Sequence, residues 1–269
     1  MSKNPDCAIL VSNLVKKFKN FTAVNQLNFC VKKGEIFAFL GPNGAGKTTT
    51  IKILTTLSNP TSGQVLVDGF NPQTQENQVR KSFGIVFQDS SIDEELTAYE
   101  NMDFHGVLYG LPNKTRKLRI QELLEMVDLA DRQKSLVKTF SGGMKRRLEI
   151  ARGLLHNPSI FFLDEPTLGL DPQTRNKIWD YIKKLNHKQK TTVFFTTHYM
   201  EEAERYADRI GIIDHGELIA IDTADNLKRS YHGKTLEDVF LKLTGRQIRP
   251  ENGETHMQTM MRMQRQNRN

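Results

Sequence analysis

The sequence predicts an α/β fold in which a mostly parallel sheet is combined with an N-terminal antiparallel β region and a helical insertion. Three observations lead to this prediction. Apolar runs typical of strands buried on both faces recur in "EIFAFL", "IFFL" and "TTVFFTTH". Segments with helical periodicity lie between these runs, as expected for strands joined by crossover helices. A charged, strand-poor stretch in the middle of the chain interrupts this alternation.

The first part of the core is expected to span residues 1–95. "LNFCVKKGE" alternates Leu27, Phe29 and Val31 with polar residues, which predicts a half-buried strand. "EIFAFL" predicts a buried strand that runs into "GPNGAGKTTT", and the helix that follows should end before Asn59 and Pro60. "GQVLVDG" and "FGIVFQ" predict two further strands.

Residues 96–137 are expected to form a helical subdomain inserted into this core. The stretch is charged, has a helical pattern and contains no strand-like run. The side chains expected to be buried there are Leu118, Leu123, Leu124, Val127 and Leu129.

The core is expected to resume over residues 138–246. After Gly143 an apolar stripe predicts a helix, and "IFFL" predicts a strand. Asp171 and Pro172 suit the cap and first turn of the next helix. "TTVFFTTH" predicts another strand and "RIGIIDHGELIAI" a hairpin. The two apolar stripes consist of Met144, Leu148, Ala151 and Leu155, and of Ile178, Ile182 and Leu185.

Composition excludes several classes of protein. The net charge of +7 is partly local, because residues 246–269 hold five arginines and two glutamates. Residues 247–269 lack periodicity, which predicts a disordered tail, with a contact to anionic lipid as the alternative. Cys7 and Cys30, the only cysteines, are not in a C-x-x-C spacing, which argues against a disulfide framework and a cysteine-rich zinc site. No apolar run is long enough for a signal peptide or a membrane span.

A complete phosphate loop (P-loop, Walker A) lies between a predicted strand and a predicted helix. Gly41 to Thr48 match G-x-x-x-x-G-K-[ST] in full. Glycines allow the backbone N–H groups to approach a phosphate, Lys47 can reach the terminal phosphates, and the Thr48 hydroxyl can ligate Mg²⁺. The sequence therefore predicts a P-loop NTPase core that binds a nucleotide.

An acidic pair ends the strand "IFFL". A carboxylate at the end of a buried strand is costly unless it has a role, so Asp164 is the expected metal ligand. Glu165 can polarise an attacking water, although a helix-capping pair is the alternative. A guanine-reading N-K-x-D motif is not found, and "TFSGG" lacks the first glycine of a serine-hydrolase elbow at Thr139.

Five motifs in one order resemble the nucleotide-binding subunit of ATP-binding-cassette (ABC) transporters. They are "GPNGAGKTT", Gln88 at the end of a strand, "SGGMKRRLEIAR", "FFLDEPTLGLD" and "TTHYMEEAE", and the resemblance spans about Ile9 to Arg246. "PTLGLDPQTR" and "TLEDVFLKLTGR" resemble the drug-resistance and nodulation-factor export (ABC-2 type) group in particular. In that group the membrane-spanning subunit is a separate polypeptide.

The resemblance implies an ATPase that works as a head-to-tail dimer, here expected to be a homodimer. Ser141, Gly142 and Gly143 would complete the ATP site of the second subunit, which explains a second anion cradle in one chain. ATP and Mg²⁺ are the expected cofactors. The expected partners are a multi-span membrane subunit and a second copy of the chain, at the cytoplasmic face of the cell membrane. The sequence does not identify the transported substrate, which the resemblance implies is recognised by the membrane subunit.

The resemblance also assigns roles to individual residues. Phe18 would stack on adenine, with a core phenylalanine as the alternative. Gln88 would touch Mg²⁺ and face the membrane subunit, His198 would contact the γ-phosphate, and Asp171 would lie at the dimer interface. The expected catalytic residues are Lys47, Glu165 and His198, and the expected metal ligands are Thr48, Gln88 and Asp164. The expected nucleotide-binding residues are Phe18, Gly41, Pro42, Asn43, Gly44, Ala45, Gly46, Lys47, Thr48, Thr49, Gln88, Ser141, Gly142 and Gly143.

The chain departs from the family pattern at Phe140 and at Met144, where leucine and glutamine are usual. Residues 145–147 are three cations close to a predicted helix N-terminus, where a solvated face is the expected interpretation and a contact to the partner subunit or the nucleotide is the alternative. A second hypothesis is a cassette ATPase that acts on DNA or the ribosome. Such relatives carry long coiled-coil insertions, zinc modules or a second cassette, and this sequence shows none of them, so no nucleic-acid partner is expected.

Overall fold

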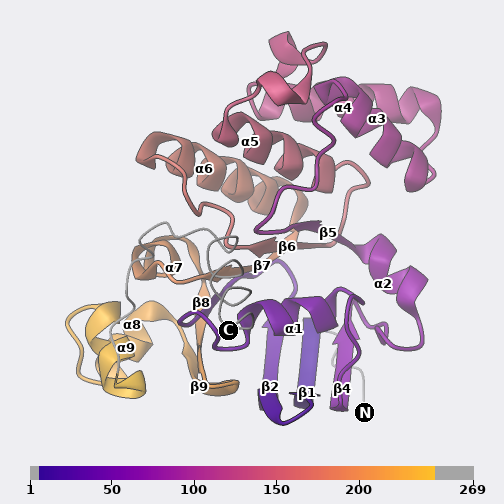
Figure 1. Ribbon diagram of the computed structural model, residues 1–269. Helices are drawn as coiled ribbons and strands as arrows, with labels where there is room; N and C mark the ends of the chain where they lie inside the picture. Colours follow the sequence, from indigo (N-terminus) through magenta and orange to yellow (C-terminus); the bar gives the residue numbers. More distant parts are fainter. Residues whose placement is uncertain (1–5, 246–269) are drawn as a thin grey trace, which may run out of the picture.

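The small antiparallel sheet predicted for the N-terminal region is present. The computed structural model describes residues 6–245. Strands β1 (Cys7–Phe18), β2 (Phe21–Lys32) and β4 (Ser62–Val67) form this sheet in the order β2-β1-β4 (Figure 1). Leu27 and Val31 of the alternating stretch are fully buried, which confirms the predicted strand.

A six-stranded sheet forms the centre of the core. Its order is β5-β6-β7-β3-β8-β9, and all neighbours are parallel except the β8–β9 hairpin. The α/β prediction, with a mostly parallel sheet and the "RIGIIDHGELIAI" hairpin, is therefore confirmed. The strands are β3 (Ile36–Leu40), β5 (Phe83–Val86), β6 (Ile160–Asp164), β7 (Thr192–Thr197), β8 (Arg209–Asp214) and β9 (Glu217–Asp222).

Helix α1 (Lys47–Leu54) lies between the two sheets (Figure 1). Alternate residues of β3 therefore face different hydrophobic clusters. Phe37 and Phe39 pack with the small sheet and α1. Ala38 and Leu40 pack on the other side of the six-stranded sheet, against the remaining helices. This arrangement fixes α1 and the loop before it at the end of a strand buried on both faces.

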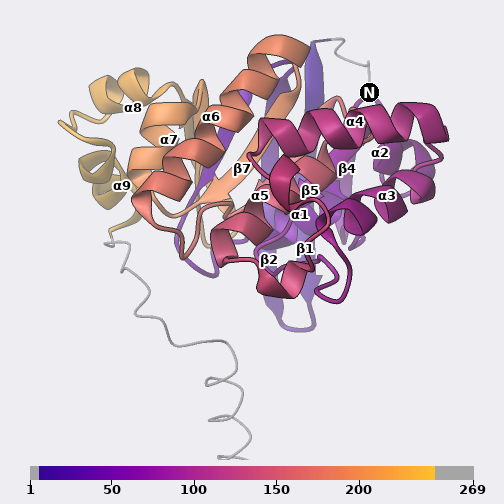
Figure 2. The ribbon, with the colours of Figure 1, turned by 90° about the horizontal axis from the view of Figure 1, so that it is seen from above.

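Helices α5, α6 and α7 pack on the other face of the six-stranded sheet, and α3 and α4 pack against α5. Helices α8 and α9 lie at the opposite end of the molecule from α3 and α4 (Figures 1 and 2). The predicted burial in the middle stretch is right for Leu123, Leu124, Val127 and Leu129, but wrong for Leu118, which is 59% exposed on α4. The helices are α2 (Glu76–Ser82), α3 (Ala98–Leu108), α4 (Asn113–Met126), α5 (Gly142–Gly153), α6 (Pro172–Gln189), α7 (Met200–Tyr206), α8 (Ala224–Ser230) and α9 (Leu236–Thr244), with short 3-10 turns at Ala130–Arg132 and Val137–Thr139.

Helices α5 and α6 bury the predicted stripes. Leu148, Ala151 and Leu155 of the first stripe are buried, whereas Met144 is only partly covered. Ile178, Ile182 and Leu185 of α6 are buried as well. The Asp171 carboxylate accepts hydrogen bonds from the backbone N–H groups of Gln173 and Thr174, so the predicted cap is confirmed. The cap fixes the start of α6.

The prediction against a disulfide is wrong for the only cysteine pair. Cys7 and Cys30 form a disulfide between β1 and β2, with their Cα atoms 5.8 Å apart. Cys30 pairs with Leu10 across the strands, and a register irregularity between Cys7 and Ile9 brings the two cysteines together. A separation of 23 residues carries no recognisable spacing, so only the strand register reveals the contact.

Among residues 6–245, no helix is long and apolar enough to cross a membrane, and no cluster of three or more His, Cys, Asp or Glu side chains could hold a metal ion. The tail predicted for residues 247–269 lies outside the described residues.

Candidate nucleotide-binding site

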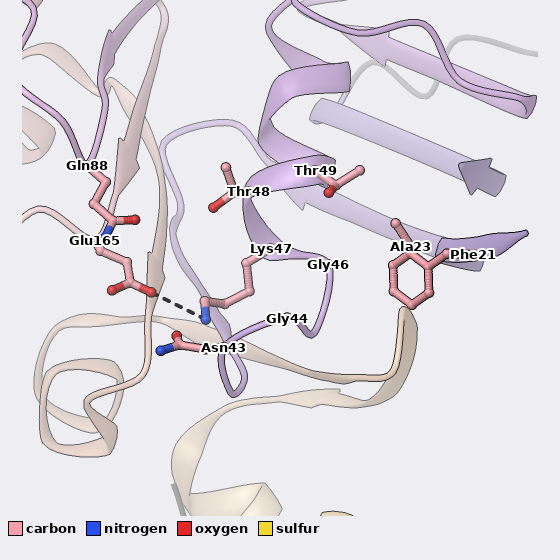
Figure 3. A pocket seen from close by; sticks show the side chains of 10 residues that line it. All are labelled: Phe21, Ala23, Asn43, Gly44, Gly46, Lys47, Thr48, Thr49, Gln88 and Glu165. Carbon is pink, nitrogen blue, oxygen red and sulfur yellow. Dashed lines mark ion pairs between the residues drawn. The ribbon is translucent and has the colours of Figure 1, made fainter. Parts of the chain in front are cut away.

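The phosphate loop, Gly41–Thr48, joins the end of β3 to the start of α1 (Figure 3). Gly44 and Gly46 have φ values of 81° and 104°, in the region that favours glycine. A Cβ atom on Gly46 would lie only 2.6 Å from the backbone oxygen of Ala23. The loop is therefore folded tightly against β2, and its shape depends on glycine at this position.

The side chain of Lys47 is folded over the phosphate loop. It is 5% exposed, and its Nζ donates to the backbone oxygens of Gly41 at 2.8 Å and Pro42 at 3.1 Å. The same Nζ lies 3.3 Å from Oε1 of Glu165, as the dashed line in Figure 3 shows. The loop thus presents a fixed cation directly opposite the acidic residue that follows β6.

A cavity of about 350 Å³ opens above the phosphate loop. It brings together Gln88, which follows β5, and Glu165, which follows β6, with the first turn of α1 (Figure 3). The residues lining it are Phe21, Ala23, Asn43, Gly44, Gly46, Lys47, Thr48, Thr49, Gln88 and Glu165.

Asp164, the last residue of β6, is 1% exposed. Its Oδ1 accepts a hydrogen bond of 2.6 Å from the hydroxyl of Thr196 on β7. Burial raises the pKa of Asp164, and the bonds from Thr196 and from the Thr48 hydroxyl partly oppose that rise. A buried carboxylate beside Thr48 and the phosphate loop offers the oxygen atoms that Mg²⁺ prefers.

Glu165 has the opposite electrostatic environment. Burial alone would raise its pKa, but the contacts with His198 and Lys47 outweigh burial, so the pKa of Glu165 is lowered overall. His198, which follows β7, places its Nδ1 3.0 Å from Oε2 of Glu165. Glu165 is therefore held as a carboxylate, with Lys47 at Oε1 and His198 at Oε2.

Glu202 on α7 is a buried residue of this region that sequence reasoning missed. Its carboxylate accepts hydrogen bonds from the hydroxyls of Thr167, which lies two residues after Glu165, and Thr197, which precedes His198. Burial raises the pKa of Glu202. Glu202 joins the segments that carry Glu165 and His198. The motif "THYMEEAE" places Glu202 shortly after the end of a strand, but it does not indicate the hydrogen-bond partners of Glu202.

The aromatic wall of the cavity differs from the expected one. Phe21, at the start of β2, lines the cavity, whereas Phe18 does not. Phe18 is 50% exposed and lies 4.9 Å from Nζ of Lys16. The two phenylalanines are paired across the β1–β2 turn, so Phe18 is next to the cavity wall. Spacing along the chain could not separate two aromatic residues in the same hairpin.

Ser141, Gly142 and Gly143, here called the signature segment, do not line the cavity. Ser141 caps α5 by accepting a hydrogen bond from the backbone N–H of Met144. Ser141 and Gly142 are exposed, and a Cβ atom on Gly142 would meet no atom within 4 Å. Within one chain the signature segment and the phosphate loop are therefore separate sites.

The solvated face expected for residues 145–147 is wrong at Arg146. That side chain is 8% exposed and bonds to the backbone around Glu165. Lys145 pairs with Glu94, and Arg147 donates to the backbone oxygen of Val127. A run of charges at a helix start is usually a solvated face. The sequence does not show the exception at Arg146, because the carbonyl groups that accept its hydrogen bonds belong to distant segments.

The family model that matches this chain is that of the ABC transporter, over residues 24–168. The linearmycin resistance ATP-binding protein LnrL of Bacillus subtilis is 45% identical over 224 residues, which cover 83% of this chain and 72% of that protein. The daunorubicin/doxorubicin resistance ATP-binding protein DrrA of Streptomyces peucetius is 42% identical over 251 residues, 93% of this chain and 75% of that protein.

Solved structures show the same fold. The ATP-binding subunit of an ABC transporter superposes with a TM-score of 0.80 at 29% identity, covering 88% of this chain and 99% of that one. A dimeric post-hydrolysis state of the ATP-binding cassette MJ0796, bound to ADP and Pi, gives 0.73 at 30% identity, with coverage of 80% and 98%.

Proposed function

The chain belongs to the ABC transporter family and is an ATPase of that family; from this premise we propose that it energises an exporter whose membrane-spanning subunit is a separate polypeptide. The observation that carries the proposal is the arrangement of Lys47, Glu165 and His198 around the cavity above the phosphate loop. Two relatives with names that refer to drug resistance support export as the direction and a drug-like compound as cargo.

The chain's own residues can perform hydrolysis as follows. Backbone N–H groups of the phosphate loop and Lys47 bind the β- and γ-phosphates, and Lys47 exchanges its present carbonyl contacts for phosphate oxygens. Glu165, kept ionised, orients the attacking water and accepts its proton. His198 holds the Glu165 carboxylate in place and is available to the γ-phosphate. Mg²⁺, bound by Thr48, Asp164 and Gln88 together with ATP, would neutralise charge on the phosphates.

We infer that hydrolysis occurs at composite sites in a head-to-tail homodimer. The signature segment is exposed, does not line the cavity of its own chain, and leaves open space at Gly142. The N–H groups at the start of α5 are suited to an anion supplied by the second subunit. The dimeric cassette among the structural neighbours supports this assembly.

The membrane subunit is proposed to dock beside Gln88 and the helices of residues 96–137, at the cytoplasmic face of the membrane. Gln88 lines the cavity and is also exposed, so one residue can respond to the nucleotide and to the partner. Three large apolar side chains on α3 are exposed, as a docking surface for a partner requires. These are Phe104, Val107 and Leu108. The proposed core consists of residues 1–95 and 138–246, and the proposed helical subdomain consists of residues 96–137.

The test of the chemistry is ATP hydrolysis by the purified chain and by Glu165→Gln. Glutamine keeps the size of glutamate but cannot accept the proton, so kcat should fall by about 100-fold or more. The variant should also form an ATP-dependent dimer in size-exclusion chromatography. Hydrolysis at the parent rate would show that Glu165 does not have this role.

The test of the partner is co-purification of tagged Glu165→Gln from solubilised membranes of its own host with ATP and Mg²⁺. A multi-span membrane protein at near-equal stoichiometry is the expected result. Ribosomal proteins or nucleic acid without a membrane partner would support instead a cassette ATPase that acts on those components.

A further inference from the structure

Arg146 lies in the second turn of α5, the helix that begins at the signature segment. Its guanidinium points away from the helix and reaches the ends of two strands of the central sheet. The side chain is 8% exposed, and its burial lowers the pKa of the guanidinium. A charge buried to this extent is costly unless most of its donors are bonded, so its partners indicate its role.

The guanidinium bonds to the backbone of the segment that contains the acidic pair. Its Nε donates to the oxygen of Pro166 at 2.7 Å, and Nη2 donates to the oxygens of Glu165 at 3.0 Å and Asp164 at 3.3 Å. These three carbonyls surround the residue proposed to orient the attacking water.

The other end of the guanidinium holds the segment that contains Gln88. Nη1 donates to the backbone oxygen of Phe87, directly before Gln88, and to Oε2 of Glu149 at 3.0 Å. Oε1 of Glu149 in turn accepts a hydrogen bond of 2.9 Å from the backbone N–H of Ser91. One side chain on α5 therefore connects the segments that carry Glu165 and Gln88.

The backbone of Glu165 needs such support. Its φ of 50° lies in the left-handed region, which is unfavourable for a residue with a Cβ atom and persists only where neighbours hold it. Thr196 accepts the N–H of Glu165, and Arg146 binds its carbonyl, so the peptide groups on both sides are fixed. The direction of the Glu165 carboxylate toward Lys47 and His198 depends on this conformation.

We propose that Arg146 is a positioning residue that links the signature helix to the hydrolytic site of its own chain. It holds the Glu165 and Gln88 segments in one arrangement relative to α5. The inference rests on the proposed dimer: the start of α5 contacts the nucleotide bound by the second subunit, so Arg146 couples binding in one composite site to the geometry of Glu165 in the other. A displacement of α5 would therefore change the position of Glu165.

Lysine cannot replace this function. The planar guanidinium offers five donors in a fixed fork, whereas an ammonium is a point charge with three donors on a flexible stem. Arg146→Lys keeps the positive charge but loses the simultaneous contacts with Phe87, Glu165 and Pro166. Misplacing a supporting group in this way typically lowers activity about 10- to 100-fold.

The experiment compares the full-length parent chain with Arg146→Lys and with Arg147→Met as the matched control. Arg147 is the next residue on α5, but it bonds the backbone of Val127 and not the site. We expect Arg146→Lys to lower kcat about 10- to 100-fold, to change the Kd of a fluorescent ATP analogue less than about threefold, and to bring the Hill coefficient for ATP closer to one. Arg147→Met should keep the parent kcat.

The inference is overturned if folded Arg146→Lys has the parent kcat and Hill coefficient, or if Arg147→Met loses as much activity. If Arg146→Lys does not fold, Glu149→Gln carries the test, because it removes the ion pair and keeps the side-chain size. An unchanged kcat in Glu149→Gln would then overturn the inference. A parent chain that hydrolyses no ATP would contradict the proposed function itself, whereas an active parent with an unaffected Arg146 variant would contradict only the coupling.

Discussion

A single hydroxyl group serves both acidic residues of the site. Thr196 is fully buried; its Oγ1 donates to Oδ1 of Asp164 at 2.6 Å and accepts the backbone N–H of Glu165 at 3.0 Å. Thr196→Val keeps the shape of the side chain and removes both bonds. We expect it to lower the free energy of unfolding by about 1–3 kcal/mol, because Oδ1 of the buried Asp164 carboxylate loses its hydrogen bond from Thr196. Urea denaturation measures this loss.

The same variant should also lower kcat for ATP hydrolysis by about tenfold or more, because Asp164 loses its bond from the hydroxyl and the N–H of Glu165 keeps only its bond of 3.2 Å to the backbone oxygen of Thr196. Thr196→Ser is the matched control, since it retains the hydroxyl. If Thr196→Val loses stability but hydrolyses ATP at the parent rate, the hydroxyl supports only the fold.

The two phenylalanines of the β1–β2 turn form a second residue-scale test. Phe18 and Phe21 are paired residues, and directly opposite residues of an antiparallel pair share one face of the hairpin. Phe21 already lines the cavity, and Phe18 lies beside it. We expect Phe21→Ala and Phe18→Ala each to raise the Kd for ATP about 2- to 12-fold, the equivalent of one aromatic stacking contact. Equilibrium titration with a fluorescent ATP analogue measures both.

The double variant should bind ATP more weakly than either single variant. A loss confined to Phe21→Ala would exclude the role expected for Phe18 from the resemblance. A loss confined to Phe18→Ala would show that the hairpin rearranges when the nucleotide binds.

For individual residues, the sequence predicts which residue types have a chemical role better than it predicts which residues are in contact. The phosphate loop, the acidic pair and His198 can be identified in the sequence because the motifs fix the types of residue expected to bind a nucleotide. Arg146 was expected on a solvated face, since its partners are main-chain carbonyls and carry no residue code. The Cys7–Cys30 contact depends on the register of two strands, which spacing alone does not determine.

At the scale of elements, α3 and α5 meet in a cluster of aromatic and titratable side chains. His105 and Tyr109 lie on α3 and in its C-cap, and Tyr109 stacks on His156 with ring centroids 3.8 Å apart. Nε2 of His105 is buried and has no hydrogen-bond partner among residues 6–245. Burial, followed by the charge of Arg152 and by His156, lowers the pKa of His105 to about 3.

This shift makes stability depend on pH. Below about pH 6.5 the unfolded chain binds a proton at His105, whereas the folded chain does not until the pH approaches about 3. The folded state therefore loses stability as the pH falls below about 6.5, by at most about 1.4 kcal/mol for each unit. Because the side chain is partly exposed, we expect a smaller slope than this limit.

His105→Phe should flatten that slope, since phenylalanine does not titrate. Urea unfolding of the parent and the variant at pH 7.5, 6.5 and 5.5 measures the difference. His187→Phe is the control, because His187 is exposed on α6. Equal slopes for the parent and His105→Phe would show that His105 does not contribute to the loss of stability in acid.

Helices and strands are predicted best from the sequence where an element has the same surroundings on both faces. The strands Ile36–Leu40 and Ile160–Asp164 are buried on both faces, so a continuous apolar run is enough to identify them. Leu118 shows the limit of such reasoning. Helix α4 buries Ile120, Leu123 and Leu124 but leaves Leu118 exposed, because burial depends on which neighbours cover each face.

For the whole molecule, the separation of the signature segment from the phosphate loop decides what one chain can do. Each chain holds one complete phosphate loop and one signature segment, which belong to different composite sites in the proposed dimer. Two inactive variants can therefore complement each other. Lys47→Ala damages the phosphate loop. Gly142→Asp places a charge in the signature segment, where a Cβ atom on residue 142 would meet no atom within 4 Å, so we expect the variant to fold.

Mixing equal amounts of Lys47→Ala and Gly142→Asp should restore ATP hydrolysis that neither variant shows alone. Random pairing makes half of the dimers mixed, and each mixed dimer contains one undamaged site and one that carries both changes. The restored rate should be roughly a quarter of the parent rate if the sites act independently, and lower if hydrolysis needs two working sites. A coupled-enzyme ATPase assay over a series of mixing ratios measures the recovery, which should be greatest at equal amounts.

Circular dichroism of Gly142→Asp alone verifies that its fold is intact. If no ratio restores activity while both variants are folded and dimeric, one undamaged composite site is not sufficient for hydrolysis, and this prediction is wrong.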